Sequence, residues 1–151
     1  GHHIPTDSPL RHLILLVEAR DSRGTALKQL AGPRLPDWCG TGDINRGHYG
    51  GNPGKAYAKI LANKWNGEYP TGAYWDHTVI VSDNRLAALA ADREEFAFET
   101  TGRKNAVVSV KLLYRRAFIT LMEQKKWNTP DIVMAEKHII LTGDQYSGRG
   151  K

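Results

Sequence analysis

The chain has 151 residues, enough for one domain that buries about 70% of the surface its unfolded chain exposes. Its formal net charge of +5 comes from scattered basic residues. The sequence has no basic stripe interleaved with aromatic residues, the pattern that would predict nucleic-acid binding. A single cysteine excludes an internal disulfide. The sequence contains no run of about 20 apolar residues, which a membrane-spanning helix would need.

The first half of the chain predicts two strands, a long loop and a helix. Residues 10–24 read as a strand and turn, and the unbroken apolar run 13–17 indicates burial on both faces. A shorter strand is expected over 25–32. The glycine- and proline-rich segment 32–54 is long for a connection, which is typical of functional or covered loops. A capping asparagine followed by proline then predicts a helix over 53–65.

The second half predicts strands and one short helix. In residues 94–100 the side chains alternate between the two faces of a strand, with Phe96 and Phe98 on the same face. Residues 106–116 show the same alternation, so the two segments are predicted to pair as an antiparallel hairpin. Residues 117–127 have apolar positions at helical spacing. Two further strands are expected over 77–83 and 131–143.

These elements predict a mostly β fold. Several strands with one or two short helices and a long Gly/Pro-rich loop favour an immunoglobulin-like antiparallel β-sandwich over a parallel α/β fold. We expect one domain over 1–142, cut from a longer protein, and a flexible tail over 143–151.

Most catalytic and metal-binding motifs are absent. The segment HYGGNPGKA lacks the first glycine and the Ser or Thr of a phosphate loop, and CGTGDIN has Asn45 where a dinucleotide fingerprint needs glycine. No H-E-x-x-H or Cys-x-x-Cys pattern predicts a self-contained metal site, and no C-x-x-C-H motif attaches a c-type haem to this chain.

An enzyme is the less favoured hypothesis. It would use Cys39 with His48 or His77 as base, but spacing alone does not bring them together, and a loop cysteine is typically a small packed residue. Asp83 and Arg85 are interpreted as a structural charge pair at a turn, with partner binding as the alternative.

Five segments in order resemble the C-terminal, haem-free β-sandwich domain of certain multihaem c-type cytochromes. The opening GHHIPTDSP is similar to that domain's G-H-(K/H)-x-P-T-G segment, although Asp7 stands where the family commonly has glycine. The other four are LRHLILLVEARDSRG, GNPGKAYAKIL, WDHTVIVSDNRLA and VSVKLLYRRAF, and the likeness spans nearly the whole chain.

The resemblance implies electron transfer in the periplasm or outside the cell. It implies a haem-bearing N-terminal domain or subunit as partner, a redox partner protein, and haem c carried by the partner rather than by this chain. It also implies that His2 or His3 serves as a distal axial haem ligand, because imidazole suits iron. Asp7 is the candidate acceptor for the other ring nitrogen.

A free-standing binding module is the alternative. It would recognise a carbohydrate, a peptide or an acidic surface through the 32–54 loop, where Trp38, His48 and Tyr49 are expected to be exposed. Trp75 and His77 are further candidates for an interface.

Overall fold

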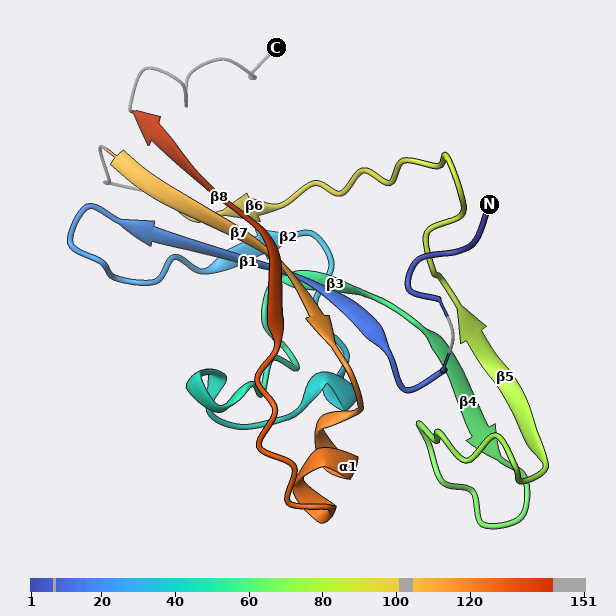
Figure 1. Ribbon diagram of the computed structural model, residues 1–151. Helices are drawn as coiled ribbons and strands as arrows, with labels where there is room; N and C mark the ends of the chain where they lie inside the picture. The colour runs from blue at the N-terminus through green and yellow to red at the C-terminus, as the bar shows by residue number, and fades with distance from the viewer. Residues whose placement is uncertain (7, 101–104, 143–151) are drawn as a thin grey trace.

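A computed structural model describes residues 1–6, 8–100 and 105–142, which form strands, one α-helix and two 3-10 helices (Figure 1). In chain order the elements are β1 (His12–Asp21), β2 (Gln29–Ala31), η1 (Asp37–Cys39), η2 (Ile44–Arg46), β3 (Gly54–Tyr57), β4 (Lys59–Asn63), β5 (Thr78–Asp83), β6 (Ala97–Phe98), β7 (Asn105–Arg115), α1 (Ile119–Gln124) and β8 (Ile132–Thr142). No helix in the described ranges is long and apolar enough to cross a membrane.

The largest sheet has the strand order β3-β1-β7-β8 and is antiparallel throughout. Its inner strand β1 is buried on both faces, as the apolar run predicted. On one face, Ile14 and Leu16 belong to a core that includes residues of the 32–54 loop. On the other face, Ala19 packs with Leu27, near β2. Cores on both sides of the sheet confirm the predicted mostly β, sandwich-like fold.

The segment predicted as a helix over 53–65 forms β3 and β4 instead. Every second residue from Gly54 to Ile60 is buried, which is the period of a strand. Gly54 lies so close to the carbonyl oxygen of Leu15 that a Cβ atom would clash. The segment also had apolar residues at helical spacing, but pairing with β1 and then with β5 stabilises the extended form.

The predicted hairpin between 94–100 and 106–116 is wrong. β6 pairs with β2, whereas β7 pairs with β1 and β8. β7 is long and largely apolar, and it pairs with two long strands, β1 and β8, so that most of its side chains are at least partly buried.

The C-terminal elements are shorter or more exposed than their patterns suggested. The helix predicted over 117–127 is confirmed only as the six residues of α1. β8 is an edge strand, and all its side chains but that of Leu141 are exposed; Ile140 is 68% exposed. The expected tail, 143–151, lies outside the described residues.

One buried side chain, Arg115 at the end of β7, fixes the 32–54 loop. Its Nε and Nη2 donate to the two carboxylate oxygens of Asp131 at 2.8 and 2.7 Å. The same guanidinium donates to the carbonyl oxygens of Cys39 at 3.1 Å and Gly47 at 2.7 Å. The loop therefore folds against the sheet through a fully hydrogen-bonded cation, as a buried charge requires.

Candidate functional site

The opening segment lies beside the chain that follows β5. The backbone N–H of Ile4 donates to the carbonyl oxygen of Leu86 at 2.8 Å, and Leu86 donates back to Ile4 at 2.9 Å. Gly1 lies against the Ala88 side chain. His2 and His3 are exposed on this segment, and within the described ranges neither imidazole makes a hydrogen bond. Two backbone hydrogen bonds thus fix a corner that carries two exposed imidazoles, and the N-terminal segment lies beside the chain that follows β5 (Figure 1).

Asp83 and Arg85 form an ion pair next to this corner. The Nε of Arg85 donates to Oδ1 of Asp83 at 2.8 Å, and Nη2 donates to Oδ2 at 2.6 Å. These hydrogen bonds lower the pKa of the Asp83 carboxyl, and the nearby charge of His3 lowers it further. The pair also raises the pKa of Arg85. Asp83 is therefore the described carboxylate that interacts with His3, whereas Asp7 lies outside the described residues.

The β4–β5 arm, defined as β4, β5 and the 64–77 loop between them, carries an exposed apolar stretch that is separated from the corner by the polar residues 82–85. Val79, Ile80 and Val81 of β5 are 38%, 59% and 51% exposed. At the far end of the arm, Trp75 is 73% exposed and its ring contacts Tyr74 edge-on at 5.1 Å. Consecutive exposed apolar residues with exposed aromatics are typical of interaction surfaces.

His77 also belongs to the arm, and its side chain is exposed just before β5. Its carbonyl oxygen accepts from the backbone N–H of Lys64 at 2.9 Å, which helps to close the 64–77 loop.

The three candidate residues on the 32–54 loop, Trp38, His48 and Tyr49, are partly buried. The Trp38 ring meets His12 at 5.3 Å and Phe118 at 5.7 Å, both edge-on. Tyr49 lies over the guanidinium of Arg115 at 5.0 Å, and burial raises the pKa of its hydroxyl. The Nε2 of His48 lies 3.1 Å from a carboxylate oxygen of Glu123. The expectation of a freely exposed loop surface is wrong for these three residues, because they pack against the domain itself.

The structure does not support Cys39 as the nucleophile of an enzyme. Cys39 is fully buried, and desolvation raises the pKa of its thiol to about 12. His48 is engaged by Glu123, and His77 lies on the arm rather than on the loop. A protonated, buried thiol is a poor nucleophile. Among the described residues no group of three or more His, Cys, Asp or Glu could hold a metal ion.

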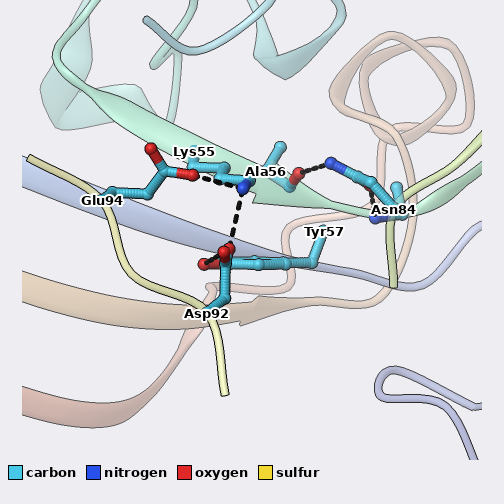
Figure 2. Close-up of polar contacts among 7 residues, drawn as sticks. Lys55, Ala56, Tyr57, Asn84, Asp92 and Glu94 are labelled. Atoms are coloured by element: carbon cyan, nitrogen blue, oxygen red, sulfur yellow. Dashed lines mark hydrogen bonds and ion pairs between the residues drawn. The ribbon is translucent and has the colours of Figure 1, made fainter. Parts of the chain in front are cut away.

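A polar cluster that the sequence did not reveal joins β3 to the connector, residues 84–96 (Figure 2). The Lys55 ammonium donates to Asp92 at 2.7 Å and to Glu94, and the Tyr57 hydroxyl donates to Asp92 at 2.9 Å. These hydrogen bonds raise the pKa of Lys55 and lower that of Asp92. Only the fold brings the two carboxylates to Lys55, which is 37 and 39 residues away in the sequence.

The fold is similar to part of a solved multihaem cytochrome. A penta-heme cytochrome c552 from Thermochromatium tepidum matches 91% of this chain at a TM-score of 0.57 and 25% sequence identity. The chain covers 33% of that cytochrome, about a third of its length. No protein-family model and no curated protein matches the chain. The similarity links this β-rich fold to part of a multihaem cytochrome c.

Proposed function

We propose that this chain is an accessory domain of a multihaem cytochrome, which packs on a haem-carrying domain or subunit and supplies a distal axial haem ligand from His2 or His3. The similarity to a third of a penta-heme cytochrome is the observation that supports the proposal most. The chain has one cysteine and no C-x-x-C-H motif, so the haem c belongs to the partner. When bound, haem supplies a reversible one-electron carrier.

The donor set at the opening corner fits this role. Both imidazoles are exposed, and neither makes a hydrogen bond within the described part of the chain, so both are accessible to an iron outside the domain. Of the two histidines, His3 is the one that interacts electrostatically with Asp83, which places a carboxylate near this candidate ligand. His2 remains the alternative ligand, since its side chain is equally accessible.

The haem-carrying partner covers the β4–β5 arm in this proposal. The exposed side chains of Val79, Ile80 and Val81 lie on β5, which ends three residues before Leu86, the residue that pairs with the histidine-bearing corner. The 32–54 loop lies below the four-stranded sheet, away from the N-terminus (Figure 1). The corner and the loop therefore do not form one docking face, and the proposed face consists of the corner and the arm.

The same proposal assigns the chain to the periplasm or the cell exterior, with a redox partner protein that exchanges electrons with the haem domain. A free-standing module that binds a carbohydrate, a peptide or an acidic surface through residues 32–54 has less support. Its aromatic residues pack within the domain: Trp38 contacts His12 and Phe118, and Tyr49 contacts Arg115.

The test uses this chain with its haem-carrying partner, matured in a host that attaches c-type haem. We expect His3→Ala or His2→Ala to convert one haem from low-spin to high-spin, measured by optical absorption and electron paramagnetic resonance. His138→Ala, at a 59% exposed histidine of β8 away from the arm, is the matched control and leaves the spectrum unchanged. Unchanged spectra in the double variant His2→Ala/His3→Ala would refute the ligand role.

The docking face has its own test. Ile80→Asp places a charge on the exposed surface of β5 and is expected to weaken association with the haem-carrying partner about tenfold or more. Ile140→Asp is the matched control, because Ile140 is equally exposed but lies on β8 of the other sheet. Equal affinity of the Ile80→Asp variant and the unaltered chain would place the partner elsewhere.

A further inference from the structure

An apolar cavity of about 480 Å³ lies on the face of the large sheet that is opposite the 32–54 loop. Its floor is made by alternate residues of β1 and β7, among them Val17 and Val110, which are directly paired across the two strands. Phe96 and Phe98 enclose it from the other layer. A drug-sized molecule fits a cavity of this volume and character.

The polar cluster of Figure 2 lies at one end of this cavity. Tyr57, Asp92 and Glu94 all line it, and Lys55 joins the two carboxylates. The carboxylate side chains remain 29% and 22% exposed, so they are within reach of a bound molecule. The cavity therefore combines a long apolar wall with a small convergent set of polar groups, the arrangement typical of ligand sites.

The hydrogen-bonding capacity of the cluster selects the chemistry of the ligand. Two ionised carboxylates accept several hydrogen bonds each, and here they receive three from the side chains of Lys55 and Tyr57. The Tyr57 hydroxyl has no second proton to donate, and Lys55 has already used two of its three. With one cation and two anions the cluster has a net charge of −1. A ligand head that donates hydrogen bonds and is positively charged complements it.

We propose that this cavity binds an amphipathic amine, with its apolar body against β1 and β7 and its ammonium group at Asp92 and Glu94. The inference does not depend on the haem-related function, because neither His2 nor His3 lines the cavity. A fatty acid is disfavoured, since its carboxylate would meet two carboxylates and compete with them for Lys55.

Titration of the whole chain with decylammonium, 1-decanol and decanoate tests the proposal by amide chemical-shift changes. These probes have the same apolar body and differ in the head group. We expect decylammonium to bind about tenfold more tightly than decanoate, with decanol between them, and to shift resonances of residues that line the cavity. Equal affinities for the two ions, or shifts located elsewhere, would overturn it.

Two variants separate the head-group contact from the apolar contact. Glu94→Gln keeps an oxygen for Lys55 but removes the negative charge, so the preference for decylammonium over decanoate is expected to fall severalfold. Val110→Trp fills the cavity and is expected to weaken all three probes. Glu123→Gln, a carboxylate on the opposite face of the sheet, is the matched control and leaves the preference unchanged. An unchanged preference in Glu94→Gln refutes the assigned head-group site even if Val110→Trp does not fold.

Discussion

His12 makes the stability of this domain dependent on acidic pH. The imidazole is fully buried at the start of β1, stacked on Phe118 with ring centroids 5.2 Å apart. Its Nδ1 donates to the carbonyl oxygen of Leu10 at 3.0 Å, and its Nε2 has no hydrogen-bond partner among the described residues. Desolvation is the main reason why the pKa of His12 is lowered from 6.5 to about 4, and the charge of Arg115 adds to it.

The sign and size of the effect follow from proton linkage. Between pH 6.5 and pH 4 the unfolded chain binds a proton at this imidazole and the folded chain does not, so protons favour unfolding. Above pH 6.5 the residue is neutral in both states and has no effect on the pH dependence. A pKa difference of this size corresponds to a loss of about 3 kcal/mol in the free energy of unfolding, complete near pH 4.

Urea unfolding at a series of pH values measures this loss. His12→Asn keeps a hydrogen-bond donor near the position of Nδ1 but cannot titrate, so between pH 7.5 and pH 4 it should lose about 3 kcal/mol less than the unaltered chain. His138→Asn, at a 59% exposed histidine of β8, is the matched control and should follow the unaltered chain closely. Parallel pH profiles for the unaltered chain and His12→Asn would show that the reasoning is wrong.

Three further predictions concern the core and the loop. Arg115→Leu should lower the free energy of unfolding by about 3 kcal/mol or more in urea titrations, because it leaves Asp131 buried without its partner, whereas the exposed Arg116→Leu should change it little. Cys39 should resist labelling by a maleimide at pH 8 in the folded protein and react promptly in denaturant; rapid labelling without denaturant would contradict its burial. Gly54→Ala should lower the melting temperature, since the added Cβ would clash with the Leu15 carbonyl oxygen, and an unchanged value by calorimetry would contradict the close approach.

Much of the fold was predictable from local pattern. The unbroken apolar run of β1 and the alternation of β7 predicted buried and paired strands, and both are found at the centre of the large sheet. The error at 53–65 has a physical cause, because lysine, alanine and leucine favour helices in isolation. Strand pairing on both sides of that segment overrides this preference. The wrong hairpin has a similar cause, because closeness in the sequence does not reveal which strands pair. β7 pairs with the long strands β1 and β8, and β6 pairs with β2.

The candidate sites were predictable to different degrees. The exposed histidines were identified because they stand out in a motif at the start of the chain, and the Asp83–Arg85 pair because its members are two residues apart. The Lys55 cluster was missed because its partners are 37 and 39 residues distant in sequence. Contacts at such separation depend on the path of the connector, which contains little regular structure and hence little pattern.

The open edge of β8 bears on how the chain behaves when it is produced alone. Among the described residues, this eleven-residue strand pairs on one side only, and an unpaired strand edge is a template onto which another extended chain can add. Ile139, Ile140 and Leu141 are consecutive apolar residues, so burial of their side chains would stabilise the added strand. Charged residues in the middle of the strand, with Lys137 at their centre, oppose it. Solubility of the separated chain therefore depends on a few charges, and neutralising Lys137 would favour fibrillar self-association over the monomer.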